Sequence, residues 1–434
     1  MDWAPILNGF TVALEPTNLI NLAIGVVLGT VIGVLPGIGP ATGVAILIPV
    51  TFGLDPTSSL IMMAGVYYGA MYGGSTSAIL INTPGDASAV MTTLDGHQMA
   101  LKGRGGAALA IAAIGSFIAG TVCVVLLTFL AQPLANLALR FGPAEYFALM
   151  VFALSAVTAL SGASLAKGMI ATVFGLMLST VGMDLQTGSQ RFTFGLPSLM
   201  DGIDFLVVVV ALFAVSEVLI NMEKAAGGTL QQPLKSGRVW LTKEEWSQAW
   251  PAILRGTPLG FLIGALPGAG GTVASILSYT VEKRVSRHPE RFGQGAIEGV
   301  AGPETANNAS SVGAMIPLLT MGVPGSGTTA VMMGALMMFG LRPGPLLFHD
   351  QPELVWGLID SMYLGNVLLL VLNLPLVGLF VKLLDVPMKV LNPIILALAF
   401  IGVYSINYSV SDLFLLAVFG LIGYLMKKVE IPTA

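Results

Sequence analysis

The amino-acid sequence predicts an all-α polytopic membrane protein with about 10–12 membrane segments, some broken or re-entrant, arranged as two inverted structural repeats. Of its 434 residues, 55% are apolar and only 10% are charged, and the mean hydropathy is +0.85. A soluble domain averages about 25% charged residues, so this chain has too few charged residues to cover the surface of a soluble protein. The apolar runs at 106–139, 203–221 and 391–426 are long enough for helices that need about 20 residues to cross lipid.

The start of the chain does not resemble a secretory signal. Residues 1–19 lack a basic segment, and Asp2, Glu15 and Pro16 interrupt the apolar pattern, so we expect no cleavage. The single cysteine, Cys123, lies in an apolar run. It is expected to pack inside a membrane helix, because one cysteine forms neither an internal disulfide nor a metal cluster.

The basic residues predict which loops lie in the cytoplasm. No lysine or arginine precedes Lys102, whereas two later stretches together hold nine of the 19. The positive-inside rule places both stretches in the cytoplasm. The segment between them, 256–280, is too short for two spans of about 20 residues and is predicted to be a re-entrant hairpin of two half-helices. The basic residues are Lys224, Lys235, Arg238, Lys243 and Arg255 in one stretch, and Lys283, Arg284, Arg287 and Arg291 in the other.

Two Pro-Gly motifs occur twice, in the same order. The string GVLPGIG at 33–39 recurs as GALPGAG at 264–270, a shift of 231 residues. The string INTPGDA at 81–87 is matched by MGVPGSG at 321–327, a shift of 240 residues. Two ordered pairs at nearly the same offset indicate a duplicated unit.

The charges around these motifs indicate that the two copies have opposite orientations. The first motif lies in a region without basic residues, whereas its counterpart has basic flanks. For the second motif the distribution of basic residues is reversed. Lys102 and Arg104 follow its first copy at 81–87, whereas only Arg342 closely follows its second copy at 321–327. Inverted repeats with broken helices are typical of secondary transporters. The predicted organisation is a first transport repeat over 1–222 with breaks at 36–39 and 84–85, a cytoplasmic basic linker over 223–255, and a second transport repeat over 256–434 with breaks at 267–271 and 324–327.

The four breaks predict a binding cavity between the repeats, because irregular backbone inside a membrane must be buried in protein or line water. Half-helix N-termini suit an anion, whereas half-helix C-termini and unwound backbone carbonyls suit a sodium ion or a proton-linked site. A single Ser or Thr in a membrane helix more often bonds its own backbone or a neighbouring helix. The predicted substrate- or ion-binding residues are Pro36, Gly37, Gly39, Ser75, Thr76, Asn82, Thr83, Pro84 and Gly85 in the first repeat, and Pro267, Gly268, Gly270, Glu304, Asn307, Asn308, Pro324, Gly325, Ser326 and Thr328 in the second.

Glu304 is the ionisable residue of most interest, since an intramembrane carboxylate is a functional candidate by default. A capping or interfacial role is the alternative. Glu217 is expected near a membrane face. Enzyme signatures are missing from the sequence: there is no Gly-x-x-x-x-Gly-Lys-Ser/Thr loop, no His-Glu-x-x-His and no Gly-x-Ser-x-Gly. We therefore expect a protein that is not an enzyme, uses no cofactor and does not hydrolyse ATP through such a loop.

Several longer strings carry a resemblance to a known family. GVLPGIGP, YYGAMYGGSTSAILINTPGD, DGHQMALKGRGGAAL, EGVAGPETANNAS and TMGVPGSGTTAVMMGA resemble the large membrane subunit of the tripartite tricarboxylate transporters, from about residue 17 to the end. The resemblance implies a permease of the bacterial inner membrane with two protein partners, a small four-helix membrane subunit and a periplasmic solute-binding protein. It also implies import of a citrate-like tricarboxylate, or of a related dicarboxylate or aromatic acid, driven by a sodium or proton gradient.

The sequence leaves other functions open. One alternative is a stand-alone carboxylate–cation symporter that needs no binding protein, and less favoured alternatives are an intramembrane enzyme or a channel. No nucleic-acid partner is expected. Members of the family usually continue with further apolar helix after a segment like GYLMKKVEIPTA. We therefore expect either a shortened chain or a member that lacks the last helices.

Overall fold

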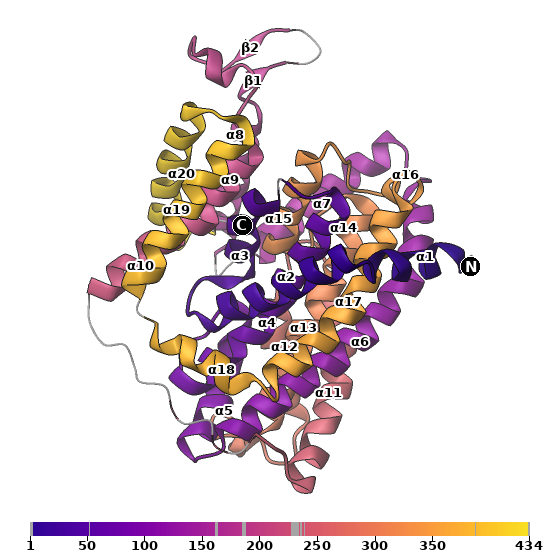
Figure 1. The fold of residues 1–434 in the computed structure, drawn as a ribbon, viewed down its shortest axis with the longest axis vertical. Helices are drawn as coiled ribbons and strands as arrows, with labels where there is room; N and C mark the ends of the chain where they lie inside the picture. Colours follow the sequence, from indigo (N-terminus) through magenta and orange to yellow (C-terminus); the bar gives the residue numbers. More distant parts are fainter. Residues whose placement is uncertain are drawn as a thin grey trace.

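The computed structural model describes residues 3–51, 53–160, 164–184, 188–226, 234, 237, 239–386 and 388–432. Two basic residues of the predicted linker, Lys235 and Arg238, lie outside these ranges. Figure 1 shows a protein made almost entirely of helices. In the described part of the chain, the only strands are the short antiparallel pair β1 (Gly182–Met183) and β2 (Gln190–Arg191). The prediction of an all-α fold is confirmed.

Five helical segments of the described chain are long and apolar enough to cross a membrane. A sixth candidate is the bent pair Val377–Leu384 and Lys389–Ser405, with an angle of 96° between its two parts. The multi-pass prediction is therefore confirmed, while the expected number of segments, which also counts broken and short helices, stays a prediction. The five are α2 (Pro16–Val34), α6 (Gly105–Ala138), the run Phe205–Glu223, α17 (Pro352–Asn373) and α20 (Val410–Lys428).

The first half of the chain begins with a series of helices separated by short breaks. Asp55 starts α4, because its carboxylate accepts hydrogen bonds of 3.0 Å from the N–H groups of Thr57 and Ser58. Asn82 ends the same helix in the left-handed conformation, with φ of 53°. Besides α2 and α6, the series contains α1 (Ala4–Ala13), α3 (Gly39–Thr51), α4 (Pro56–Ile81), the 3-10 turn η1 (Ala87–Ala89) and α5 (Val90–Leu101).

The second half contains a similar series. Thr242 and Glu245 form a reciprocal capping box at the start of α11, which fixes where this helix begins. Proline at 251 and 258 does not end α11, and the helix stops only before the Pro-Gly break. The series consists of α11 (Lys243–Gly264), α12 (Gly270–Val285), the turn η4 (Pro289–Arg291), α13 (Glu298–Gly313), α14 (Met315–Met321), α15 (Gly327–Met338), α16 (Leu347–Asp350) and α17.

A second group of helices packs beside these series, at the left of Figure 1. It is formed by α9, η3 and α10 of the first half together with α19 and α20, and it contacts α3. The helices and turns not yet described are α7 (Pro143–Leu160), α8 (Leu165–Ser179), η2 (Pro197–Leu199), α9 (Phe205–Val210), the π-helical turn η3 (Ala211–Val215), α10 (Ser216–Ala226), α18 (Val377–Val381), η5 (Lys382–Asp385) and α19 (Met388–Asn407).

Helices α2 and α4 pack backbone to backbone through glycine, and so do α11 and α13. In each pair, three glycines spaced one turn apart lie against carbonyl oxygens of the partner helix, so that any Cβ there would collide with backbone. Small residues at such positions allow membrane helices to approach closely. The contacts are Gly25, Gly29 and Gly33 on Met62, Val66 and Ala70, and Gly256, Gly260 and Gly264 on Gly302, Ala306 and Ser310. The glycines of the two pairs are 231 residues apart and the carbonyls 240, the same two shifts that relate the Pro-Gly motifs.

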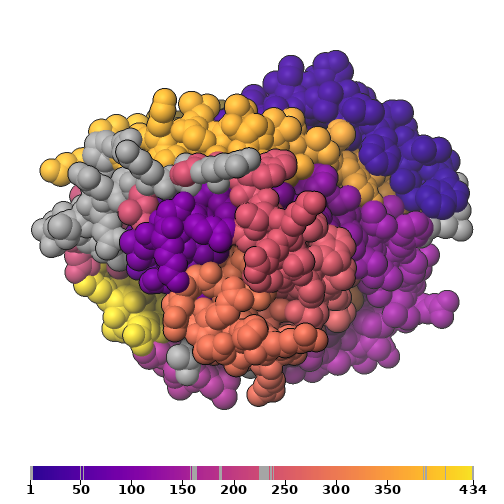
Figure 2. Space-filling view, turned by 90° about the horizontal axis from the view of Figure 1, so that it is seen from below, coloured from indigo at the N-terminus to yellow at the C-terminus, as the bar shows by residue number. Residues whose placement is uncertain are grey.

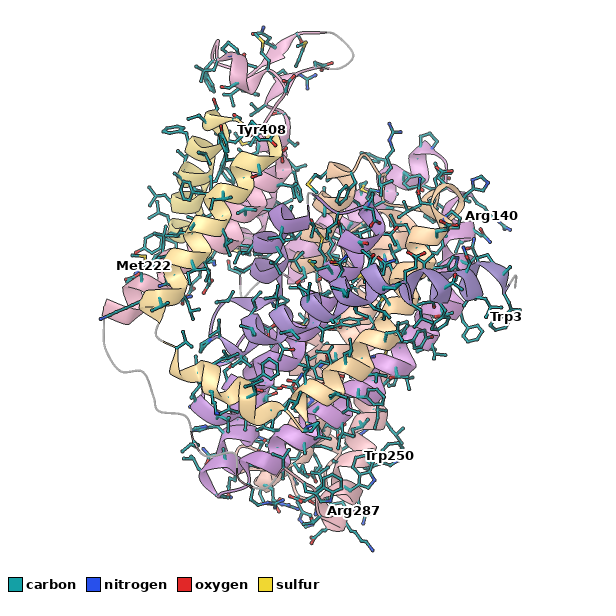
Figure 3. All side chains as sticks on the ribbon, viewed as in Figure 1. Trp3, Arg140, Met222, Trp250, Arg287 and Tyr408 are labelled. Atoms are coloured by element: carbon teal, nitrogen blue, oxygen red, sulfur yellow. The ribbon has the colours of Figure 1, made fainter. Side chains whose placement is uncertain are left out.

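One end of the molecule collects basic loops that are far apart in sequence. Lys102 donates a hydrogen bond of 2.5 Å to the carbonyl oxygen of Gln294, and Arg104 pairs with Glu245 at the start of α11. Figure 2 looks at this end and shows the segment around residue 100 beside α11 and the α12–α13 loop. Figure 3 places Arg287 and Trp250 there, far from Tyr408. One face of the membrane protein is therefore enriched in positive charge.

This distribution gives a topology prediction. Cysteines introduced at Arg287 and at Lys235 are expected to react with a membrane-impermeant thiol reagent only from the cytoplasmic side, because basic loops stay in the cytoplasm. A cysteine at Phe194, an exposed residue just after β2, is the control for the opposite end of the molecule. Labelling of position 287 from the periplasm of intact cells would contradict the assignment and the hairpin with it.

Candidate functional site

The two breaks of the first half lie against each other. Residues 35–38 separate α2 from α3, and Gly37 and Gly39 have φ of 81° and 64°, which only glycine adopts without strain. The Gly37 N–H donates a hydrogen bond of 3.1 Å to the carbonyl oxygen of Gly85, in the break that follows α4. A Cβ at Gly85 would collide with the carbonyl of Gly33. Both Pro-Gly motifs of this half therefore form one compact unit of irregular backbone.

The second half repeats this construction. Gly268 and Gly270 have φ of 76° and 57°, and Gly322 ends α14 with φ of 70°, as Asn82 ends α4. Ser326 caps α15 by accepting a 3.3 Å hydrogen bond from the Thr329 N–H. In the first half, Asp86 accepts a 3.3 Å bond from the N–H of Ser88 in the same way.

Gly325 has the surroundings of a close-packing position. A Cβ built on it would lie 2.7 Å from the Cα of Ala314 and 2.9 Å from the carbonyl oxygen of Gly264. Real Cβ atoms do not make such contacts. A larger residue there must separate the two breaks, so the structure favours a packing role for this glycine, in addition to any role beside a ligand.

The breaks of the two halves also meet each other. A Cβ built on Gly271, in the first turn of α12, would lie 2.8 Å from Oδ1 of Asn307 and 2.9 Å from Cβ of Ser88. On the other side, the hydroxyl groups of Tyr67 and Ser326 lie 3.2 Å apart. The irregular backbone of all four motifs is thus brought to one region in the middle of the helix bundle.

This region contains buried polar atoms that have no hydrogen-bond partner among the described residues. Most buried polar groups in proteins are hydrogen-bonded, so such atoms indicate an ordered water, an ion or a ligand. Asn307 is fully buried, and neither its amide nitrogen nor its oxygen has a partner. The others around α12, α13 and the η1 turn are Oδ1 of Asp86, Oγ of Ser275, Oγ of Ser278, Oε2 of Glu298, Oε2 of Glu304 and Oγ1 of Thr305.

Glu304 and Asn308 link α13 to the first half of the chain. One carboxylate oxygen of Glu304 accepts a hydrogen bond from the hydroxyl of Thr92 on α5. The amide of Asn308 donates a 2.6 Å bond to Ser116 on α6 and a 3.2 Å bond to the Glu304 carbonyl. The amide nitrogen of Asn308 therefore already has hydrogen-bond partners, whereas Oε2 of Glu304 has none among the described residues.

Some predicted site residues contribute no buried, unpartnered polar atom. The side chains of Asn82 and Thr83 are exposed, and Thr83 bonds the carbonyl of Ile81 at 3.3 Å. Ser75 bonds its own helix at the Tyr72 carbonyl, 2.7 Å away, and Thr76 is buried nearby in α4. Pro36, Pro84, Pro267 and Pro324 lie in the breaks but carry no N–H, and Thr328 is buried in the first turn of α15.

Two polar neighbours of the first break were not predicted from the sequence. Glu217 and Asn221 of α10 approach Gly37, with Oε1 of Glu217 3.0 Å from a Cβ built there. Glu217 also forms an ion pair of 2.5 Å with Lys427. No local pattern links residues so far apart in the chain. Among the described residues, no group of three His, Cys, Asp or Glu side chains could hold a metal ion.

Long apolar helices, interrupted in pairs at glycine-rich breaks that meet in a polar interior, define an α-helical polytopic membrane protein built as a transporter. Comparison with known families gives the particular family. The chain belongs to the tripartite tricarboxylate transporter TctA family, whose family model matches residues 19–434. The resemblance inferred from the sequence motifs is confirmed.

Two proteins of Agrobacterium vitis are similar to the chain. An uncharacterized 52.8 kDa protein from the TAR-I ttuC′ 3′ region is 49% identical over 420 residues, which cover 97% of this chain and 84% of that protein. An uncharacterized protein from the TAR-II ttuC′ 3′ region is 50% identical over 170 residues, which cover 39% of this chain and 70% of that protein. No solved structure matches the chain.

Proposed function

We propose that the chain is the large permease subunit of a binding-protein-dependent secondary transporter that imports small carboxylates, driven by a cation gradient. The observation that carries this proposal is the meeting of four helix breaks around buried, unpartnered polar atoms. Freed N–H groups at the half-helix N-termini suit a carboxylate. Free carbonyl, hydroxyl and carboxylate oxygens suit a sodium ion or a proton.

We further propose that the two halves are inverted transport repeats, over 1–222 and 256–434, joined by a cytoplasmic linker. Helices α6 and α17 follow the second break of their respective halves. Gly120 of α6 lies against the side chain of Asn366, whereas Thr128, further along α6, bonds the hydroxyl of Tyr363, earlier in α17, at 3.0 Å. The two helices therefore run antiparallel, which supports inversion.

The family supports partners and a location for this chain. The large subunit of a tripartite system works with other subunits, and we propose a small four-helix membrane protein and a periplasmic solute-binding protein, in the bacterial inner membrane. The substrate class is a citrate-like tricarboxylate or a related dicarboxylate or aromatic acid. A stand-alone carboxylate–cation symporter is the alternative, and the same experiment separates the two.

The test is uptake into proteoliposomes that contain the chain and its small subunit, across a panel of radiolabelled carboxylates. We expect uptake only when the binding protein is added and a sodium or proton gradient is imposed. Uptake should persist without ATP, because the sequence has no phosphate-binding loop. Gradient-dependent uptake without any binding protein would favour the stand-alone symporter, and ATP-dependent uptake without a gradient would refute the proposal.

A further inference from the structure

Polar side chains are spaced along one helix interface between the central breaks and the basic end of the molecule. It lies where η1 and α5 pack against α12 and α13. Three contacts along η1 and α5 define it: Ser88 lies beside Gly271, Thr92 bonds Glu304, and Oδ2 of Asp95 accepts a 2.9 Å hydrogen bond from Tyr279. We call this set the polar row, and its members are Ser88, Thr92, Asp95, Ser275, Tyr279, Glu304 and Asn307.

The middle of the polar row is unsatisfied. Oγ of Ser275, Oε2 of Glu304 and both amide atoms of Asn307 are buried without a partner. Helical spacing puts Gly271, Ser275 and Tyr279 on one face of α12, one turn apart. Buried polar atoms at such spacing are what water molecules bridge inside proteins.

The far end of the polar row is closed by satisfied bonds. Oδ1 of Asp95 accepts three backbone N–H bonds, from Gly293, Gly295 and Ala296, at 2.7–2.9 Å. These residues belong to the loop between α12 and α13, which lies at the basic end. The row therefore reaches the surface loop that the charge distribution places in the cytoplasm.

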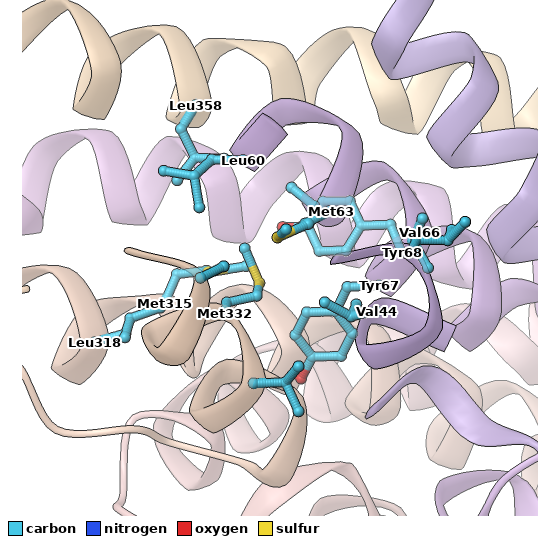
Figure 4. Packing of buried hydrophobic residues seen from close by; sticks show 14 of the residues in the cluster. Val44, Leu60, Met63, Val66, Tyr67, Tyr68, Met315, Leu318, Met332 and Leu358 are labelled. Carbon is cyan, nitrogen blue, oxygen red and sulfur yellow. The ribbon is translucent and has the colours of Figure 1, made fainter. Parts of the chain in front are cut away.

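Five of the seven equivalent positions in the other half belong to a hydrophobic core. The shifts of 231 and 240 residues relate Ser275 to Val44, Glu304 to Ala64 and Thr92 to Met332. The same shifts relate Tyr279 to Ile48 and Asp95 to Ala335. All five counterparts are buried in one apolar cluster, and Figure 4 shows Val44 and Met332 in it beside Tyr67. We call this set the apolar counterpart. The other two counterparts, Thr328 for Ser88 and Tyr67 for Asn307, carry hydroxyl groups. The two interfaces are therefore similar in construction but differ in polarity at five of the seven positions.

We propose that the polar row is a proton pathway between the central breaks and the cytoplasmic end, with Glu304 as the group that carries the proton, and that the apolar counterpart seals the opposite end. The inference rests on the proposed function and names its coupling ion. Glu304 binds one proton from water at Oε2 and later releases it to water, while Thr92 keeps its bond to Oε1. No bond other than O–H forms or breaks.

The surroundings of Glu304 suit the binding of a proton. In the described chain, Glu304 forms no ion pair, and the residue that bonds its carboxylate is a neutral hydroxyl. A buried carboxylate without a positive partner is costly, and binding a proton removes that cost.

Several of the other ionisable groups on the elements packed against α13 already have hydrogen-bond or ion-pair partners. Asp95 has four hydrogen bonds, Glu282 is paired with Arg255 at 2.5 Å, and His97 bonds the carbonyl of Ile79 at 3.0 Å. Asp86, at the central end, keeps one free oxygen. The remaining ones are Lys243, Glu244 and Glu245 on α11, Cys123 on α6, Lys283 and Arg284 on α12, Glu298 on α13 itself, and Tyr67, Tyr68 and Tyr72 on α4. Glu304 is thus the carboxyl in the middle of the row with a free oxygen.

The first test is hydration of the two interfaces, and it requires no transport. In a background with Cys123→Ala, we compare Ser275→Cys with the matched Val44→Cys in the purified protein, using a charged methanethiosulfonate reagent. We expect labelling at 275 and none at 44 over the same time. Equal labelling of both, or labelling of 44 alone, would overturn the asymmetry.

The second test is proton coupling. Glu304→Gln keeps the size of the side chain and an acceptor for Thr92 but cannot bind and release a proton. In proteoliposomes we expect it to lose uptake driven by a proton gradient while it still exchanges internal for external carboxylate. The control is Glu298→Gln on the same helix, also with an unpartnered carboxylate oxygen, which should keep proton-driven uptake.

The outcomes separate this inference from the proposed function. A wild-type protein that neither takes up nor exchanges any carboxylate refutes the proposed function, whereas the cysteine labelling still reports on the pathway. Normal proton-driven uptake by Glu304→Gln, or wild-type uptake that follows a sodium gradient alone, overturns the proton pathway. If Glu304→Gln is not recovered as a monodisperse protein, Glu304→Asp takes its place, and unchanged proton-driven uptake with an unchanged pH profile then counts against the inference.

Discussion

Replacement of Gly260 by leucine is expected to prevent the accumulation of folded protein. A Cβ at this position meets the backbone carbonyl of Ala306, and backbone, unlike a side chain, cannot rotate away. Overpacked cores usually lose about 1–3 kcal/mol, and here the whole contact between α11 and α13 must open. We expect a loss above that range, measured as disappearance of the monodisperse peak in fluorescence size-exclusion chromatography and as a fall in melting temperature.

Two further variants make this prediction specific. Gly29→Leu places the same side chain at the equivalent contact of α2 with α4, where the carbonyl of Val66 is the obstacle, and it should be as damaging. Gly175→Leu is the control, because a Cβ on this exposed residue of α8 has nothing within 4 Å. If Gly260→Leu and Gly175→Leu were equally well folded, the glycine contact would not hold the two helices together.

The repeated motifs predict a large part of the architecture. The Pro-Gly strings mark where the helices break, and glycines with positive φ are found at Gly37, Gly39, Gly268 and Gly270. The reason is local, since a proline or glycine alters the backbone of its own segment. The glycines along α2 and α11 and the carbonyls that they contact are related by the same shifts of 231 and 240 residues. The same helix contact therefore occurs in both halves of the chain.

The contents of the site could not be predicted to the same extent. Thr92 and Glu304 lie 212 residues apart, and only tertiary packing brings them together. Ser275 reads as an ordinary small residue in a membrane helix until its missing hydrogen-bond partner is seen. Conversely, Asn82 and Thr83 are polar and adjacent to a break, yet their side chains are exposed. Proximity along the chain identifies a break but not whether a side chain beside it is buried.

The second large effect is expected at Asp95, which ties the first half of the chain to the α12–α13 loop. Its fully buried carboxylate accepts three backbone N–H bonds and one from the hydroxyl of Tyr279. Asp95→Ala leaves all four donors without an acceptor. Each buried donor without a partner costs about 1–3 kcal/mol, so we expect a loss of roughly 3–5 kcal/mol, comparable to breaking a buried ion pair. Thermal unfolding and the recovery of folded protein measure it.

A graded series distinguishes the carboxylate from its individual bonds. Asp95→Asn retains one oxygen that can accept the three loop N–H groups, so it should cost less than Asp95→Ala but lose the strength that charge adds to these bonds. Tyr279→Phe removes only the bond to Oδ2 and should cost about 1 kcal/mol. The loop is expected to loosen in the same order, with hydrogen exchange at Gly293, Gly295 and Ala296 fastest in Asp95→Ala. Equal stability of Asp95→Ala and Tyr279→Phe would show that the loop amides find other acceptors, and that Asp95 does not close the end of the polar row.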